Sequence, residues 1–501
     1  MRRGRCAWVC AIQTERKQGM SETKKRTAGK SFLFKLLEST GTQGISLVVG
    51  IVLARLLSPS DYGVLSLLMV FVSISRVFVQ SGLNTALIQR LKVDKTDLSS
   101  VFYVSLGVSG VCYAILYATA PLLAATYGQP ELTALMRVLA LILFPGALHS
   151  VQQAVIAREM AFHKLMVASI AANVLSGAVG IAMAYAGFGS WALIAQQLSG
   201  QVIICVILLV TVHWRPRLLY AWHRVKSLLS FGWKLLASSL IETVYNNLRT
   251  LVIGKLYDSE QVGYFNRGRQ FPELLMNNVN GSIQSVMLPM FAAEQENPAR
   301  LKAMMRRTIM VSSYLVFPMM AGLALVARPL VSLLLTDKWL PAVPFLWICC
   351  ADFAFYPVHT SNLQAINAMG RSDVFLRLEL IKKAYGLAIL AASILFFDSV
   401  IIIAAGSVVS TLIGTFVNAA PNKRLLGYRY GEQVRDLAPS LGMTLVMGVC
   451  VWIAGFLPLH DLPLLLAQGA VGVLVYGGLS LLIKPEAYRG MVDMIRALRR
   501  R

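Results

Sequence analysis

The feature that most constrains the fold is a succession of apolar runs, each about 20 residues long, which is the length a helix needs to cross a ~30 Å hydrocarbon core. The runs are continuously apolar and do not alternate, so they favour helices over the strands of a membrane barrel. We predict an all-α polytopic membrane protein with about fourteen transmembrane helices. Their expected ranges are 32–57, 62–88, 99–126, 132–156, 165–187, 190–212, 229–257, 262–291, 308–335, 341–368, 375–397, 399–420, 438–458 and 463–483.

The basic residues predict the orientation of these helices. Only 14% of the residues are charged, yet the formal net charge is +23. Of the 47 Lys and Arg residues, 36 lie at the two ends or in alternate connections and only 3 lie in the opposite connections. This is the positive-inside pattern, which places both termini in the cytoplasm and argues against nucleic acid as the partner. The remaining connections are too short to form an external catalytic domain.

An internal repeat predicts two lobes. The pattern Phe34–Ser39 recurs at Trp233–Ser238, and Arg55-Leu56 recurs at Lys255-Leu256. An offset of six helices makes the two copies parallel, as in transporters built from two six-helix bundles. The expected organisation is a basic cytoplasmic tail (1–30), an N-terminal six-helix lobe (31–212), an interfacial linker (213–228), a C-terminal six-helix lobe (229–420), a cytoplasmic loop (421–437), an extra helix pair (438–483) and a second basic cytoplasmic tail (484–501). Met20 is an alternative start.

The sequence carries no pattern typical of a catalytic or metal site. It lacks HExxH, GxxxxGK[ST], GxSxG and a DxD motif, and its seven cysteines and six histidines have no zinc-ligand spacing. We therefore predict a protein that is not an enzyme and has no metal and no cofactor. A proton-relay role for His149 or His359 stays open.

Function is expected where polar residues interrupt the apolar runs, above all between Ser230 and Phe291. A charge at mid-bilayer costs roughly 2.5–3.5 kcal/mol even on the mildest scale, so these groups must line a wet cavity. The predicted substrate-binding arginines are Arg76, Arg249, Arg267 and Arg269. Arginine presents a planar fork that matches phosphate oxygens, so an anionic phosphate or pyrophosphate is the expected ligand. The alternative is that each arginine pairs with Glu242, Glu273 or a helix C-terminus for structural reasons.

Other polar residues extend the predicted site. Lys35 and Lys234 occupy equivalent repeat positions and either form a basic vestibule or snorkel to the interface. Asn277, Asn278 and Asn280 offer donors and acceptors for a glycan, or they join helices. Glu242 and Asp352 are candidates for ion coupling, or they form salt bridges with arginine. Prolines such as Pro318 and Pro357 permit bends within their spans.

Five segments carry a family resemblance: LARLLSPSDYG, SGLNTALIQR, AREMAFHKL, NNLRTLVIGKLYDSEQVGYFNRGRQFP and INAMGRSDVFLRLELIKK. Together they resemble bacterial polysaccharide and lipopolysaccharide flippases of the multidrug/oligosaccharidyl-lipid/polysaccharide exporter superfamily, over about Lys30 to Arg435. The resemblance implies two six-helix lobes around a cationic cavity in the bacterial cytoplasmic membrane. It also implies that an undecaprenyl-pyrophosphate-linked oligosaccharide moves from the inner to the outer leaflet.

The resemblance leaves some points open. Many relatives carry an acid in the segment matching Asn246–Arg249, where this chain has Arg249, so a cation site in that segment is in doubt. Polysaccharide polymerase or assembly proteins are possible partners. The alternative functions are a cation-coupled multidrug exporter of the same superfamily and a membrane glycosyltransferase. The carried glycan and the driving ion cannot be read from the sequence.

Overall fold

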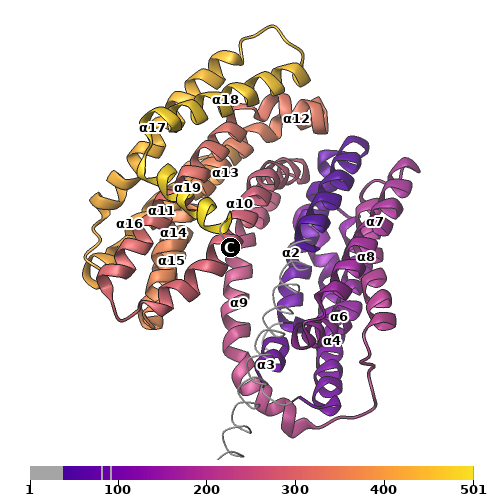
Figure 1. The fold of residues 1–501 in the computed structure, drawn as a ribbon. Coiled ribbons are helices and arrows are strands. Elements are labelled where there is room, and N and C mark those ends of the chain that lie inside the picture. Colours follow the sequence, from indigo (N-terminus) through magenta and orange to yellow (C-terminus); the bar gives the residue numbers. More distant parts are fainter. Residues whose placement is uncertain (1–37, 81–82, 91–92, 500–501) are drawn as a thin grey trace, which may run out of the picture. The chain divides into compact units, whose positions relative to one another are not determined.

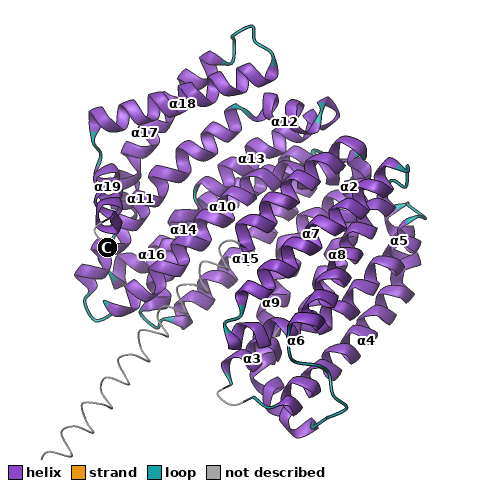
Figure 2. Cartoon of the chain, turned by 45° about the vertical axis from the view of Figure 1, so that its right-hand side comes forward, coloured by secondary structure: helices purple, strands orange, loops and turns teal. Residues whose placement is uncertain are grey.

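The computed structural model describes residues 38–80, 83–90 and 93–499. All regular elements among these residues are helices, and no strand occurs among them (Figure 2). The all-α prediction is therefore confirmed. The helices divide into two compact units, which meet between Leu248 and Arg249 (Figure 1).

The first unit consists of long helices joined by short connections. Its helices are Glu38–Leu56, α2 (Pro59–Gln80), α3 (Leu83–Gln89), α4 (Lys95–Tyr127), α5 (Leu132–Leu139), the 3-10 turn η1 (Ala140–Ile142), α6 (Leu143–Glu159), α7 (Phe162–Tyr185), α8 (Ser190–Thr211) and most of α9 (Trp222–Leu256). The segment predicted as an interfacial linker, 213–228, is irregular up to Ala221 and then forms the start of α9.

The second unit begins in the last turns of α9 and holds the rest of the chain. Its helices are α10 (Ser259–Ala293), α11 (Pro298–Leu325), α12 (Ala327–Leu335), the 3-10 turn η2 (Asp337–Ala342), α13 (Val343–Ala354), α14 (Tyr356–Ala368), α15 (Ser372–Phe396), α16 (Val400–Leu425), α17 (Tyr430–Ala454), α18 (Asp461–Ile483) and α19 (Glu486–Arg499). The predicted lobe and tail boundaries stay predictions.

Eleven helical segments of the described chain are long and apolar enough to span a membrane. The chain is thus a multi-pass membrane protein. The other three predicted spans coincide with α9, α10 and α15, which are long enough to span but are not among the eleven segments. The helices are compatible with fourteen spans, and that number stays a prediction.

The two helical hairpins at the predicted repeat are built alike. Before α2, the carboxylate of Asp61 accepts hydrogen bonds from the backbone N–H and the hydroxyl of Ser58, at 2.9 and 2.6 Å. Before α10, Asp258 accepts a hydrogen bond from the backbone N–H of Gln261 at 2.7 Å. Such acids satisfy the free N–H groups of a helix start and favour its positive dipole end. Each hairpin thus reverses the chain within a few residues.

A close approach fixes α10 against α13 in the second unit. A Cβ atom added to Gly268 would lie 2.6 Å from the carbonyl oxygen of Ala342 and 2.9 Å from the backbone nitrogen of Leu346. Only glycine leaves room for this contact. Because Gly268 lies between Arg267 and Arg269, the same contact sets where both guanidinium groups begin.

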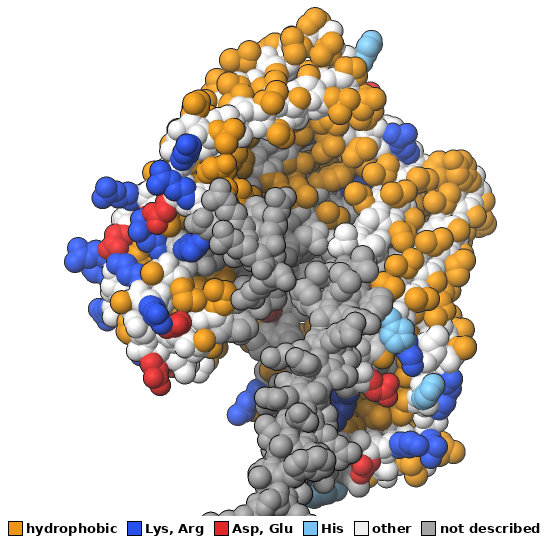
Figure 3. Space-filling model, in the orientation of Figure 1, with side chains coloured by type: hydrophobic (Ala, Val, Ile, Leu, Met, Phe, Trp, Pro, Cys, Tyr) orange, Lys and Arg blue, Asp and Glu red, His pale blue; other side chains and the backbone are white. Residues whose placement is uncertain are grey.

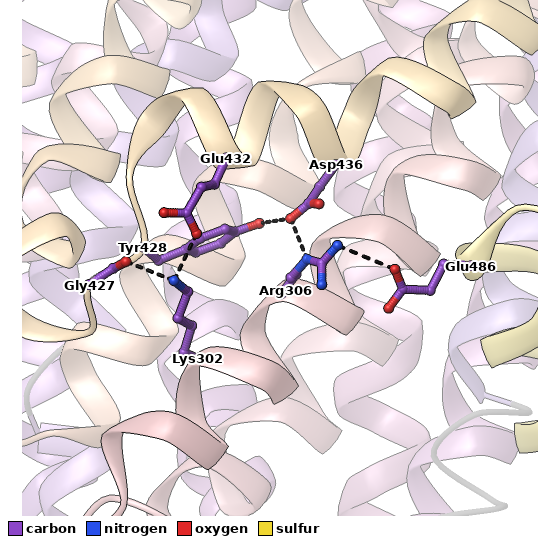
Figure 4. Close-up of polar contacts among 7 residues, drawn as sticks. All are labelled: Lys302, Arg306, Gly427, Tyr428, Glu432, Asp436 and Glu486. Atoms are coloured by element: carbon purple, nitrogen blue, oxygen red, sulfur yellow. Dashed lines mark hydrogen bonds and ion pairs between the residues drawn. The ribbon is translucent and has the colours of Figure 1, made fainter.

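An ion-pair cluster joins three helices of the second unit (Figure 4). Arg306 on α11 binds Asp436 on α17 at 2.8 Å and Glu486 on α19 at 3.3 Å. One turn earlier on α11, Lys302 lies 2.7 Å from Glu432 and donates to the carbonyl of Gly427 at 2.8 Å. In the face drawn in Figure 3, Lys and Arg side chains gather at this edge of the unit, and apolar side chains cover α17 and α18.

Candidate anion-binding site

Arg76 lies in the last two turns of α2, within the first unit. Its Nε atom is buried, and no hydrogen bond or ion pair joins its guanidinium to another residue in the described part of the chain. The nearby titratable group is His149 on α6, which is 8% exposed and whose Nδ1 also has no hydrogen-bond partner. This helix pair therefore holds a cation that no carboxylate neutralises.

Arg249 is the corresponding cation of the second unit. It lies in the last two turns of α9, and its buried Nε has no hydrogen-bond partner among the described residues. Asp352 on α13 lies within electrostatic reach, and the same carboxylate also faces Arg269. Asp352 is close to the middle of the candidate span Asp337–Ala368, so these groups lie at membrane depth.

The carboxylate of Asp352 is held from the side opposite to the arginines. Thr411 on α16 donates its hydroxyl hydrogen to Oδ1 of Asp352, and the hydroxyl of Ser407 lies one turn away on the same helix. No ion pair joins Asp352 to an arginine among the described residues. Of the two open readings of Asp352, the salt bridge is therefore not formed in this structure.

Arg267 and Arg269 are both engaged within the second unit. Arg267 is 7% exposed, donates to Oε1 of Gln270, and lies 5.5 Å from the ring centroid of Trp339. Arg269 forms an ion pair with Glu273 one turn later on α10, with 3.0 Å between Nε and Oε2. The four predicted arginines thus form two groups: Arg76 and Arg249 lack a carboxylate contact, and Arg267 and Arg269 have local partners.

Comparison with known proteins identifies the family. A model of the polysaccharide biosynthesis protein family matches residues 52–344, which is more than half of the chain. The chain belongs to this family. The succinoglycan biosynthesis transport protein ExoT of Rhizobium meliloti is 24% identical over 487 residues, which cover 94% of this chain and 96% of ExoT. The lipopolysaccharide biosynthesis protein WzxC of Escherichia coli is 23% identical, covering 87% of this chain and 86% of WzxC.

Solved structures share the fold of this polysaccharide biosynthesis protein. The lipid II flippase MurJ in an inward closed conformation has a TM-score of 0.72 at 14% identity and covers 92% of this chain and 100% of its own. A multidrug resistance MATE transporter of the MOP superfamily, in an inward-facing conformation, has a TM-score of 0.59 at 15% identity. It covers 77% of this chain and 95% of its own. The predicted fold class and superfamily are thus confirmed.

The remaining predicted residues of this polysaccharide biosynthesis protein are spread over several helices. Lys35 lies outside the described residues, and Lys234 and Glu242 are exposed on α9. Asn277 and Asn278 are exposed on α10, where Asn278 donates to the carbonyl of Leu274 at 2.9 Å. Asn280 accepts a hydrogen bond from Thr360 on α14 at 2.7 Å, so it joins two helices.

The structure adds residues that the sequence did not single out. His359 on α14 has a partner, Asn418 on α16, at 2.8 Å, and its Nε2 atom is buried without one among the described residues. Tyr356 on α14 and Thr411 on α16 lie around Asp352. These contacts join helices far apart in the sequence, so no local pattern marks them. Glu273 did have a local signal, because a carboxylate four residues after Arg269 shares its helix face.

Proposed function

We propose that this protein is a flippase that moves an undecaprenyl-pyrophosphate-linked oligosaccharide from the inner to the outer leaflet of the bacterial cytoplasmic membrane. The family is that of polysaccharide biosynthesis proteins, and ExoT, which matches nearly the whole chain, is named a transport protein. The name of MurJ, which shares the fold, describes it as a flippase for a lipid-linked precursor. Transport by alternating access, without a catalytic step, fits these relatives.

The observation that carries the proposal is the pair of buried arginines without a carboxylate partner, Arg76 and Arg249. A guanidinium held in a membrane helix is costly unless an anion compensates it. Arginine binds phosphate oxygens with two parallel hydrogen bonds, and such bonds are strong in a low-dielectric site. A pyrophosphate group is therefore the ligand that best fits these two positions.

The other predicted residues take supporting roles in this proposal. Arg267 and Arg269 would assist at the pyrophosphate, and Lys35 and Lys234 would attract the anionic headgroup first. Asn277, Asn278 and Asn280 would contact the glycan, while Glu242 and Asp352 would carry a coupling ion. Both termini would lie in the cytoplasm, where polysaccharide assembly proteins could be partners.

The test is the double variant Arg76→Ala/Arg249→Ala in a strain whose surface polysaccharide depends on this protein. Each lost guanidinium should weaken a charged hydrogen bond by about 1.5–3 kcal/mol, which is roughly 10–100-fold in affinity. We expect surface polysaccharide to disappear at an unchanged level of protein in the membrane. Arg328→Ala is the matched control, because Arg328 is an exposed arginine at the start of α12. Normal polysaccharide in the double variant would refute the proposal.

A further inference from the structure

The ion pair of Arg269 and Glu273 is placed where a ligand could displace it. The two residues are one turn apart on α10, with 3.0 Å between Nε and Oε2. The side chains are 31% and 39% exposed, respectively, so the pair is within reach of a solute. The neighbouring Gly268 packs directly on the backbone of α13, which fixes the helix that carries the pair.

The charges around this pair come from four helices of the second unit. Arg249 of α9, Cys349 and Asp352 of α13 and Tyr356 of α14 all lie within electrostatic reach of the pair or of one another. Of these neighbours, Asp352 is held by Thr411 of α16. The cluster thus contains two guanidinium groups and two carboxylates, which balance. An anion is attracted strongly only when a carboxylate gives up its arginine.

This balance distinguishes between ligands by their charge. A ligand with one phosphate offers Arg269 about the same contact as Glu273 already does, so the exchange gains little. A ligand with two linked phosphates can bind Arg269 and Arg249 together, because both guanidinium groups face the same side of α13 through Asp352 and Cys349. The second contact supplies the free energy that the exchange requires.

We propose that Glu273 is the selectivity residue of a diphosphate site in the second unit. Its carboxylate occupies Arg269 until a diphosphate displaces it, and it thereby excludes monophosphates and small monovalent anions. This inference rests on the proposed function, since it concerns the group that the flippase would hold. Glu273 acts through Arg269 and does not itself contact the ligand.

The experiment compares two probes on the purified full-length protein in lipid nanodiscs: undecaprenyl diphosphate and undecaprenyl monophosphate. The wild type should bind the diphosphate more tightly. Glu273→Gln should bind the monophosphate at least tenfold more tightly than the wild type does, so that the preference for diphosphate collapses. Glu273→Asp keeps the charge and should retain the preference, which a purely structural role would not predict. It also keeps the question testable if the Gln variant folds poorly.

The control for the removal of a carboxylate is Glu260→Gln. Glu260 is an exposed acid in the first turn of α10, where it accepts a hydrogen bond from Tyr264 at 2.6 Å. This variant should leave both affinities unchanged. An unchanged preference in Glu273→Gln would overturn the inference while the proposed function stands. If the wild type binds neither probe better than Arg76→Ala/Arg249→Ala does, the proposed function fails, and the inference fails with it.

Discussion

The closest approach between helices in the second unit leads to a quantitative prediction for Gly268→Ala. The added Cβ would lie 2.6 Å from the oxygen of Ala342, 2.8 Å from Cβ of Phe345 and 2.9 Å from the nitrogen of Leu346. Unstrained contacts lie near 3.5–4.0 Å, so α10 and α13 would have to separate by about 1 Å. Two of the three atoms belong to the backbone and cannot rotate away.

The expected cost follows from two opposing terms. Overpacking costs about 1–3 kcal/mol, and backbone obstacles place this site at the upper end, at about 3 kcal/mol. Alanine regains about 1 kcal/mol of helix propensity, which leaves a net loss of about 2 kcal/mol. For units of this size the thermal midpoint should fall by roughly 4–8 °C.

Thermal unfolding in detergent, followed by tryptophan fluorescence, measures this effect. Trp339 is a suitable probe, because it is fully buried and its ring packs edge-on against that of Tyr264 on α10, with 6.1 Å between centroids. The control is Gly281→Ala in the same helix, where no atom lies within 4 Å of the added Cβ. That variant should melt at or slightly above the wild-type temperature. If Gly268→Ala melts like the control, the argument from close packing is refuted.

Two further predictions concern polar contacts in the second unit. Asn362 is fully buried and bonds to Gln433 at 3.0 Å and to Asn422 at 2.8 Å, so Asn362→Leu should strand both amides. We expect a loss of about 1–3 kcal/mol, measurable as a lower unfolding midpoint, and a stability equal to wild type would contradict it. In the exposed pair of Arg371 and Asp373, the hydrogen bond from Arg371 lowers the pKa of the Asp373 carboxyl to about 2. The contribution of the pair to folding is therefore present at neutral pH and lost only as the pH falls through about 2; carboxyl NMR titration of Arg371→Gln should show that pKa rising towards its ordinary value.

Helices could be predicted well from the sequence because the membrane imposes both their length and their internal hydrogen bonding. The hairpin after Leu256 was marked by an acid and a break in hydropathy, and Asp258 indeed caps α10. The permitted bend at Pro357 coincides with the first turn of α14. The start of α9 at Trp222 was not predicted, since its first turns are too basic and polar to resemble a span.

The candidate site could be predicted only in part. The sequence placed Arg249, Arg269 and Asp352 at membrane depth, because charges there stand out against apolar neighbours. It left open which arginine pairs with a carboxylate, and the structure pairs Arg269 with Glu273. The contact of Asp352 with Thr411 joins residues 59 positions apart, so it depends on how α13 packs against α16. No periodicity of a single sequence encodes that register.

The cluster around Arg306 bears on the order in which the protein can be made. Arg306 pairs with Glu486, which lies 180 positions later and within 15 residues of the last one (Figure 4). The second unit therefore cannot close all of its ion pairs until nearly the whole chain has left the ribosome. The first unit draws on no residue beyond Leu248 for its own packing, so it can mature while translation continues. Insertion of the two halves should thus be staggered in time, with the final helix completing the second half.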